Sequence, residues 1–276
     1  MLAKAPGLAA DELVIDLEDA VAASSKEAAL ARVVAVLASE AWADVAVSVR
    51  VNAPRTPWCH LDITGLAAVP QQPAGIVVPK VESAGDLAFV DRLLDGAEAR
   101  AGRARPLRVE ALIETAAGLS RVQEIAVASP RLDALILGYA DLAVSLGRTG
   151  AGGEDLDAWR AAQEMVLLAA RAHGLQAIDG PYLGVAIDAA FSTAVARARE
   201  LGFDGKWAIH PSQLTALNEA FTPTEAEVEG ARDVLAALAQ AEREGGAGAV
   251  AVDGQMLDEA LRAAALRTLA RAGEAA

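Results

Sequence analysis

Two neighbouring apolar segments of the chain each lead to a single carboxylate. "RVEALIETAAG" (108–118) reaches Glu114 where its apolar run ends, and "LILGYADLAVSLGR" (135–148) places Asp141 after its own. Mg²⁺ prefers oxygen ligands and takes only one or two protein carboxylates while it keeps several waters. If the two segments are adjacent strands, Glu114 and Asp141 together predict a site for a hard cation.

The other apolar segments also end in polar residues, although their bodies are apolar. The full set of polar residues at these ends is Asp16, Glu18, Asp19, Arg50, Asn52, Lys80, Glu82, Glu114, Asp141, Asp179, Lys206 and His210. In a parallel barrel the active site lies at the C-terminal ends of the strands. Each acid alone is also explained as a helix cap. Arg50 directly follows "VAVSV", so it should point into the barrel mouth, where it needs an anionic partner.

Other chemistries fit the sequence less well. His60, His173 and His210 share no helical spacing, which argues against a histidine metal site. The single cysteine, Cys59, excludes an internal disulfide and a cysteine-based zinc site. A Ser-His-Asp order with a nucleophile elbow is absent from the sequence. Lys80 is interpreted as a substrate or structural contact, because nothing in the sequence argues for the depressed pKa of a Schiff-base lysine.

Short β-type runs alternate with amphipathic helical stretches along most of the chain. The predicted strands lie within 12–19, 45–52, 75–81, 108–114, 134–142, 176–183 and 205–211, and each is followed by a helix or helical turn. Repeated βα units imply a parallel sheet with short crossovers. Their number favours an α/β TIM (β/α)₈ barrel over an open sheet. A Gly-rich phosphate fingerprint is missing after the first strand, which disfavours dinucleotide binding.

Composition limits the classes of function. The 276 residues are 54 % hydrophobic and only 4 % aromatic, as expected for Ala-rich helices packed on a buried sheet. The net charge of −14 argues against nucleic-acid binding. Apolar runs of about eighteen residues are absent, which argues against a membrane span. With one cysteine and no secretory signal in the first residues, we expect a cytoplasmic protein.

Two segments stand outside the repeat. "GRTGAGGEDLD" (147–157) is Gly-rich and predicts a mobile loop beside the acid at Asp141. From residue 223 the chain predicts a helix, a Gly break at 245–248, a short extended piece and a final helix. We therefore expect a barrel at 1–222 and a C-terminal helical arm at 223–276. The arm's apolar stripe of Met256, Leu257, Leu261, Leu266 and Leu269 needs a covering surface, which we expect a neighbouring subunit to provide.

Seven segments, taken in order, strongly resemble one family. They are "VIDLEDAV", "VRVNAP", "VVPKVES", "ALIET" with "GLSRVQEIA", "LGYADLAVSLG", "GFDGKWAIHPSQ" and "DGQMLDEA". Together they resemble the citrate lyase β-subunit-like branch of the HpcH/HpaI aldolase family, the acyl-CoA lyases. The resemblance covers about residues 3–270, and it is specific because the segments occur in the same order.

The resemblance implies a TIM barrel, a trimer or hexamer, and a Mg²⁺ ion (Mn²⁺ as an alternative) held by Glu114 and Asp141. It implies that Arg50 stabilises the thioester enolate while the metal polarises the keto acid. Glu18 would orient Arg50, and Asp19 would hold a metal-bound water. In related lyases the aspartate that matches Asp258 reaches a neighbouring subunit's site as acid or base. An ordinary helix-capping role is the alternative for Asp258. Asp16, Asn52 and Lys80 are expected around this centre or against the substrate.

The sequence departs from the family pattern in two places. Relatives begin with one more strand, so we expect either that the given sequence starts after that strand or that the barrel lacks the family's first strand. A missing strand would leave edges unpaired and put coenzyme A binding in doubt. Relatives often carry "G-x-E-D" at the sixth strand, whereas Ala140 stands at the acid's position here. Citrate lyase β subunits, which act on an acyl carrier, tend towards the acid. This favours a stand-alone coenzyme A enzyme.

Three functions remain open at this level. The first is a Mg²⁺-dependent lyase that cleaves a 3-hydroxy-3-carboxyacyl-CoA (citramalyl-, malyl- or citryl-CoA) to acetyl-CoA and a 2-oxo acid, or runs in reverse. The second is a coenzyme A-independent 2-oxo-acid aldolase. The third is a truncated, non-catalytic paralogue that serves as a partner subunit. Arg50, Glu114 and Asp141 are all retained, which argues against the third, because a non-catalytic scaffold has no reason to keep a charged barrel mouth.

Overall fold

The computed structural model describes residues 2–149, 156–243, 250–252 and 255–274. Most of the predicted Gly-rich loop, 150–155, and the Gly break at 245–248 lie outside the described residues. The chain forms two compact units, Met1–Leu217 and Asn218–Ala276. Each unit is therefore described by itself.

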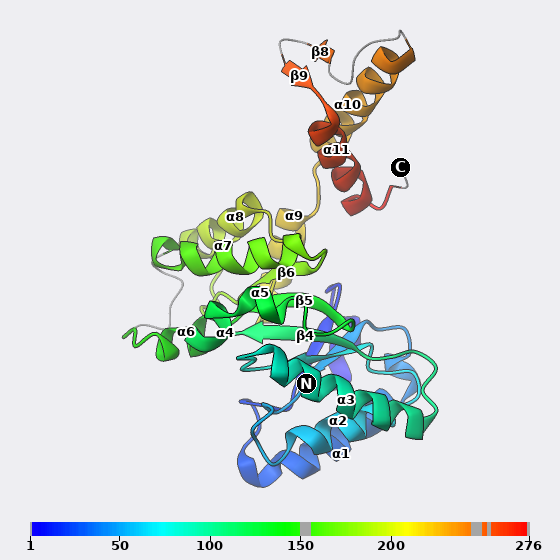
Figure 1. Cartoon of the computed structure of the whole chain (residues 1–276), viewed down its shortest axis with the longest axis vertical. Helices are drawn as coiled ribbons and strands as arrows, with labels where there is room; N and C mark the ends of the chain where they lie inside the picture. Colours follow the sequence, from blue (N-terminus) through cyan, green and yellow to red (C-terminus); the bar gives the residue numbers. More distant parts are fainter. Residues whose placement is uncertain (1, 150–155, 244–249, 253–254, 275–276) are drawn as a thin grey trace. The chain divides into compact units, whose positions relative to one another are not determined.

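A parallel sheet of seven strands forms the centre of the first unit. The strands are β1 (Leu13–Asp16), β2 (Val47–Arg50), β3 (Gly75–Val78), β4 (Arg108–Ile113), β5 (Leu132–Leu137), β6 (Gln176–Asp179) and β7 (Gly205–Lys206), paired in sequence order. The sheet curls like part of a TIM barrel, with the connecting helices packed against it (Figure 1). The predicted fold class and the seven predicted strands are confirmed. Within the described residues, β1 and β7 each pair with a single neighbour.

Helices connect successive strands, as right-handed βα crossovers require. They are α1 (Lys26–Leu37), α2 (Cys59–Ala67), α3 (Ala84–Ala101), α4 (Ala116–Ser120), α5 (Val122–Ile125), α6 (Tyr139–Ser145), α7 (Leu156–Ala172) and α8 (Ala189–Leu201), and α9 (Leu214–Phe221) follows the last strand of the sheet. Short 3₁₀ turns occupy Leu2–Gly7, Ala23–Ser25, Glu40–Trp42 and Pro211–Gln213. In Figure 1, α1, α2 and α3 lie together on one side of the unit and α7 and α8 on the other.

The structure moves two predicted boundaries. The segment 134–142 does not stay extended as far as Asp141, because α6 begins at Tyr139 and places Asp141 in its first turn. The last strand is only Gly205–Lys206, so His210 lies beyond the strand end and caps a 3₁₀ turn instead. Both shifts follow from local backbone geometry that the apolar pattern alone does not specify.

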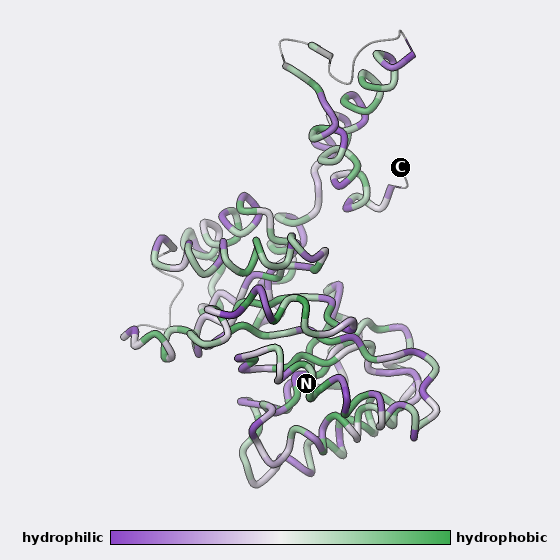
Figure 2. The backbone as a smooth tube through the Cα atoms, viewed as in Figure 1, coloured by the Kyte–Doolittle hydropathy of each residue, from purple (hydrophilic) through white to green (hydrophobic). Residues whose placement is uncertain are grey.

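An apolar layer fills the inside of the curled sheet. Val77, Leu112 and Ile136 are buried in one cluster, and Ile178 and Trp207 pack against it. The strands β4 and β5 are correspondingly hydrophobic in Figure 2. Because side chains alternate along a strand, the same face of β4 that carries Leu112 also carries Glu110 and Glu114. The charged residues thus flank an apolar layer.

The second unit is built on two helices. They are α10 (Glu225–Arg243) and α11 (Glu259–Arg271), joined through the antiparallel strands β8 (Val250–Val252) and β9 (Gln255–Leu257). The buried residues between the helices are Val228, Ala231, Ala265 and Leu269. None of the described helices of the chain is long and apolar enough to cross a membrane.

The predicted apolar stripe of the arm is divided by this packing. Leu269 is buried against α10 and Leu257 is buried as well, so these two residues do not need a neighbouring subunit. That part of the expectation was wrong, because the sequence pattern does not reveal that α10 covers α11. Met256, Leu261 and Leu266 remain exposed.

Candidate active site

Arg50 and Asp16 form a forked ion pair at the ends of β1 and β2. The two residues are register partners, so their side chains leave adjacent strands at the same level. Arg50 Nε and Nη2 donate to the two Asp16 oxygens at 2.8 and 2.6 Å. Burial opposes the charge on Asp16, but the Arg50 hydrogen bonds and charge hold its pKa below the usual value. This geometry fixes the guanidinium plane and leaves the remaining N–H groups for other partners.

Glu18 has a lesser share in orienting Arg50 than the sequence predicted. Its Oε2 lies 3.2 Å from Arg50 Nη1, whereas its Oε1 accepts a 2.5 Å hydrogen bond from Lys80 Nζ. Burial raises the pKa of the Glu18 carboxyl, and the Lys80 and Arg50 charges work against that rise. Glu18 therefore bridges Arg50 and Lys80. The orientation of Arg50, which the sequence analysis assigned to Glu18, comes mainly from the two hydrogen bonds to Asp16.

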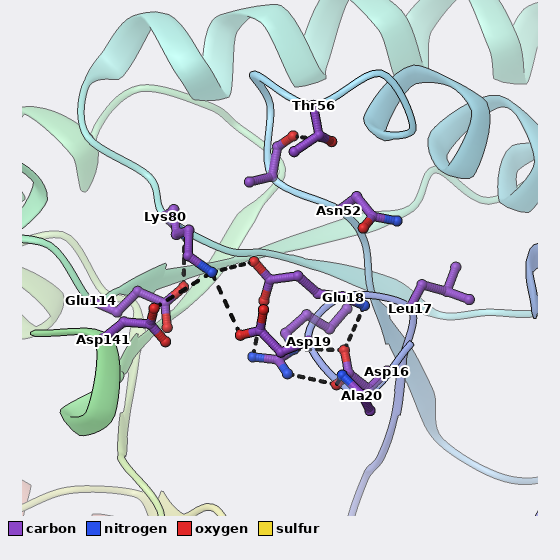
Figure 3. Close-up of polar contacts among 12 residues, drawn as sticks. Asp16, Leu17, Glu18, Asp19, Ala20, Asn52, Thr56, Lys80, Glu114 and Asp141 are labelled. Carbon is purple, nitrogen blue, oxygen red and sulfur yellow. Dashed lines mark hydrogen bonds and ion pairs between the residues drawn. The ribbon is translucent and has the colours of Figure 1, made fainter. Parts of the chain in front are cut away.

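Lys80 connects the acids that follow β1, Glu18 and Asp19, with the pair formed by Glu114 and Asp141. Its Nζ lies 3.6 Å from both Asp19 and Asp141, in addition to the Glu18 contact, as the dashed lines in Figure 3 show. Its backbone N–H donates to Glu114 Oε1 at 2.9 Å. Lys80 has φ of 51°, in the left-handed region that a lysine adopts at some cost. This backbone conformation lets one residue present both its amide and its ammonium group to the site.

Lys26 holds the loop that carries these acids, and the sequence reasoning missed it. Its buried Nζ donates to the carbonyls of Leu17 and Glu18 at 2.8 and 2.6 Å. The signal was present, because Lys26 lies on the same helix face as Val33 and Leu37, the buried face of α1. A lysine on an apolar stripe needs buried acceptors.

Glu114 and Asp141 lie side by side and point towards Lys80 (Figure 3). Glu114 is 2 % exposed at the end of β4, while Asp141 is partly exposed in the first turn of α6. The intervening Gly138 is required, because a Cβ there would lie 2.6 Å from Glu114 Cβ and 2.7 Å from Glu114 Oε2. Burial, and then the charges of Asp141 and Glu18, raise the pKa of Glu114 to about 8.

The donor set fits a hard divalent cation. Five carboxylates (Asp16, Glu18, Asp19, Glu114 and Asp141) surround two cationic side chains (Arg50 and Lys80), so acidic groups outnumber the cations, and this excess of acids helps to raise the pKa of Glu114. All of the nearby donors are oxygens, as Mg²⁺ prefers. Among the described residues, no three His, Cys, Asp or Glu side chains form a cluster that could hold a metal by themselves. A two-carboxylate Mg²⁺ site that leaves positions for water and substrate agrees with that finding.

Asn52 lies apart from this charged group. It is buried, and both its backbone N–H and its Nδ2 donate to Asp62 Oδ2, at 2.9 and 2.7 Å. Asp62 lies on the buried face of α2 and was not singled out from the sequence. The Asn52–Asp62 pair ties the end of β2 to α2, so it stabilises the backbone behind Arg50.

The remaining strand-end residues have other partners. Glu82 lies 3.6 Å from Arg55 near the surface. Asp179 forms a buried ion pair with Lys206 at 2.5 Å. Asp258 lies in the second unit, where its Oδ1 caps α11 by accepting from the N–H groups of Ala260 and Leu261 at 3.0 and 3.2 Å. Its catalytic role stays a prediction.

The sequence and the fold match a known family. The HpcH/HpaI aldolase/citrate lyase model matches residues 1–211. An L-malyl-CoA/beta-methylmalyl-CoA lyase of Rhodobacter capsulatus is 39 % identical, over 91 % of this chain and 83 % of its own length. A (3S)-malyl-CoA thioesterase of Cereibacter sphaeroides is 38 % identical, over 98 % of this chain and 90 % of its own length. The chain belongs to the HpcH/HpaI aldolase/citrate lyase family, as its seven segments predicted.

Solved structures agree with this assignment. A citrate lyase from Burkholderia xenovorans LB400 superposes with a TM-score of 0.84 at 25 % identity, covering 96 % of this chain and 85 % of that one. The protein CitE of Mycobacterium tuberculosis, in complex with magnesium, acetoacetate and coenzyme A, gives a TM-score of 0.78 at 32 % identity, covering 99 % and 93 %. The family is therefore one in which this fold holds Mg²⁺ and coenzyme A together in at least one member.

Proposed function

We propose that the protein is a Mg²⁺-dependent carbon–carbon lyase that cleaves malyl-CoA or a related 3-hydroxy-3-carboxyacyl-CoA to an acyl-CoA and a 2-oxo acid. The observation that carries this proposal is the buried Glu114 carboxyl beside Asp141. Lys80 contacts both of these acids, and it also contacts Glu18, which is paired with Arg50. The 39 % identity to malyl-CoA/beta-methylmalyl-CoA lyases over most of the chain supports the substrate class.

Each residue has a defined task in this reaction. Glu114 and Asp141 would hold the metal, which would supply Lewis-acid polarisation of the hydroxy-acid part of the substrate that becomes the 2-oxo acid. In the cleavage direction the hydroxyl proton leaves, the carbon–carbon bond breaks, and its electron pair moves onto the thioester as an enolate, which then takes a proton at carbon. The N–H groups of Arg50 that Asp16 leaves available stabilise the negative charge on the thioester oxygen. Asp16 keeps that guanidinium aligned before the substrate binds.

Thioester hydrolysis is the second candidate. The (3S)-malyl-CoA thioesterase relative aligns with 98 % of this chain, more than the lyase relatives do. Hydrolysis requires water at the thioester carbonyl, whereas carbon–carbon cleavage is favoured when water is excluded from the enolate. The two activities use the same substrate and differ in their products.

A product assay separates the candidates. The purified full chain is incubated with (3S)-malyl-CoA and Mg²⁺, and acetyl-CoA, glyoxylate, free coenzyme A and malate are quantified chromatographically. The lyase proposal expects equal amounts of acetyl-CoA and glyoxylate, lost on chelation with EDTA. Free coenzyme A and malate in equal amounts would replace the proposal with hydrolysis, and no turnover of malyl-, citramalyl- or citryl-CoA would refute both.

We further propose that the protein works as a homo-oligomer, with a trimer as the expected state. Exposed apolar side chains follow the C-terminal end of β6 and β7, namely Leu183, Val185, Ile187 and Ile209, and the second unit exposes Met256, Leu261 and Leu266. Two such separate surfaces on one chain suit a head-to-tail interface that closes into a ring. In that arrangement Asp258 of one copy serves the site of the next.

Mixing two inactive variants tests the shared site. Asp258→Ala and Glu114→Ala are combined after verified subunit exchange. If sites are shared between copies, mixed oligomers regain part of the lyase activity, because some sites combine an intact Asp258 with an intact Glu114. A mixture that stays inactive, or an active monomer in light scattering, contradicts the shared site.

A further inference from the structure

A second polar network lies beside the metal site and has no role in the reaction described above. Tyr139 opens α6, two residues before Asp141, and it is 5 % exposed. Its hydroxyl donates to Asp179 Oδ1 and accepts a 2.8 Å hydrogen bond from Gln163 Nε2. The hydroxyl is therefore satisfied in both of its hydrogen-bonding capacities by residues from β6 and α7.

Asp179 is itself held firmly. It ends β6 and is the register partner of Lys206 at the end of β7. Lys206 Nζ donates to Asp179 Oδ2 at 2.5 Å and to the Gly180 carbonyl at 2.6 Å, and both side chains are at most 2 % exposed. A buried ion pair of this kind is costly to break, because removal of one partner leaves an unpaired charge. The tyrosine is thus tied to a fixed point in the sheet.

Close packing restricts the tyrosine ring as well. The edge of the Trp159 ring system meets it with 5.1 Å between centroids, and Lys206 Nζ lies 5.5 Å from the ring centre. At Gly180 an added Cβ would lie 2.2 Å from the Leu137 carbonyl and 2.7 Å from Tyr139 Cδ2. The backbone at Gly180 therefore packs closely against the tyrosine ring.

The other side of the same turn is held by β4. Gly138 N donates to the Ile113 carbonyl at 3.0 Å, and Gly138 packs directly against the Glu114 side chain. The first turn of α6, which carries Asp141, is thereby fixed between the end of β4 and the end of β6. Asp141 itself is partly exposed, and Lys80 Nζ lies 3.6 Å from its Oδ1. Its position depends mainly on the backbone that Tyr139 anchors.

We propose that Tyr139, through Asp179 and Lys206, is a positioning residue that holds Asp141 at the place where the metal needs it; this rests on the proposed function. Mg²⁺ demands nearly ideal octahedral geometry, so a small displacement of one of its two carboxylates weakens binding. Groups that hold metal ligands in place typically contribute 10–100-fold to metal affinity or activity. Tyr139 touches neither substrate nor metal in this role.

The test is Tyr139→Phe, which keeps the ring and removes only the hydroxyl. Mg²⁺ affinity is measured by calorimetry on the purified full chain, and the lyase rate is measured over a range of Mg²⁺ concentrations. The dissociation constant for Mg²⁺ should rise about tenfold. The rate at saturating Mg²⁺ should stay within about twofold of the wild-type rate, and far-UV circular dichroism should be unchanged. Tyr182→Phe is the matched control, because Tyr182 lies in the β6–α8 loop outside this network, and it should bind Mg²⁺ like the wild type.

The outcomes separate the inference from the proposed function. If the wild-type chain does not bind Mg²⁺, the proposed function fails. If the wild type binds Mg²⁺ and Tyr139→Phe binds it equally well, the positioning role alone is wrong. Gln163→Met provides an independent variant in case Tyr139→Phe folds poorly, since it removes the 2.8 Å donor to the same hydroxyl. It should weaken Mg²⁺ binding in the same direction by a smaller factor, and an unchanged affinity overturns the inference.

Discussion

Glu110 and Glu114 lie on the same face of the same strand region, yet they have opposite environments. Leu112 separates them within the apolar layer. Glu110 is 6 % exposed and Glu114 is 2 % exposed, and burial is the main cause that raises the pKa of each, to about 7 and about 8. The second cause differs: Glu12 acts on Glu110, and Asp141 acts on Glu114. Burial alone therefore does not make a carboxylate functional.

The charge of the acids around Glu110 is balanced by neighbouring side chains. Ser48 Oγ lies 2.5 Å from Glu12 Oε1 and 2.7 Å from Glu110 Oε1. One hydroxyl hydrogen satisfies only one of these contacts, so a second proton must sit on one of the two carboxyls. Arg108 reaches Glu12 at 3.5 Å and Asp133 at 2.5 Å, which closes the cluster. A shared proton is sufficient here, and a metal is not needed.

The Glu114 side leaves its charge available. Its Oε1 accepts a hydrogen bond from the Lys80 amide, and the charges of its neighbours Asp141 and Glu18 raise its pKa. The structural difference is one of access, because Asp141 and Asp19 open this group towards the strand ends where substrate arrives. The comparison teaches that a candidate metal site is distinguished by uncompensated, accessible oxygen donors rather than by buried acids as such.

The largest expected effect comes from neutralising each glutamate in turn. Glu114→Gln should abolish measurable Mg²⁺ binding in calorimetry and lower the lyase rate by about a thousandfold, because it removes one of the two proposed metal ligands. Glu110→Gln is the matched control on the same strand and should retain Mg²⁺ binding and activity. Equal losses in both variants would show that the two glutamates do not differ in function.

Arg50→Lys is expected to have the next largest effect. Lysine keeps the charge but loses the planar fork that Asp16 aligns. The turnover rate should fall by about a hundredfold, while the Mg²⁺ dissociation constant should hardly change. A variant that keeps most of its activity would remove Arg50 from the mechanism.

A change of pH should alter the dissociation constant for Mg²⁺ by a smaller factor. In the proposed site the metal needs the Glu114 carboxylate, and the pKa of this carboxyl in the metal-free protein is raised to about 8. As the pH falls from 8.5 to 7, protons compete with Mg²⁺, so the dissociation constant should rise by roughly tenfold. Calorimetry across this range checks it, and a constant affinity would mean that Glu114 is already ionised at pH 7.

The smallest expected effect is on stability at the Glu110 side. The pKa of Glu110 is higher in the folded chain than the usual 4.5, so the folded state binds more protons between about pH 4.5 and pH 7. The free energy of unfolding should therefore fall as the pH rises through this window. Glu110→Gln should flatten this dependence and stabilise the chain by about 1 kcal/mol at pH 8, because weaker contacts with Ser48 offset part of the relief.

Urea unfolding at pH 5 and pH 8 measures this change. The wild type and Glu110→Gln should differ more at pH 8 than at pH 5. If the difference between the two proteins is the same at pH 5 and pH 8, Glu110 does not take up a proton on folding in this window, and the assignment of the shared proton is wrong.

The sequence by itself determined the seven strands, their parallel order and the presence of charge at their ends. Apolar runs of strand length that alternate with amphipathic helices have few stable arrangements, and parallel order brings their C-terminal ends to one edge. That is why Arg50, Lys80 and Glu114 were predicted to share a site, and in the structure Lys80 links Glu114 to the Arg50 system through Glu18.

Only the tertiary structure decided which polar side chains form hydrogen bonds and ion pairs with one another. Asp16 rather than Glu18 makes the two-point ion pair with Arg50, because Asp16 is the register partner of Arg50 in the β1–β2 pair. Asn52 donates to Asp62 because α2 packs beside the end of β2. Lys26, Gly138 and Tyr139 gain their importance from contacts with segments 8 to 40 residues away. Sequence patterns report which face of an element is buried. The partner that a buried polar atom finds is set by the path of the whole chain, so it becomes visible only in the folded structure.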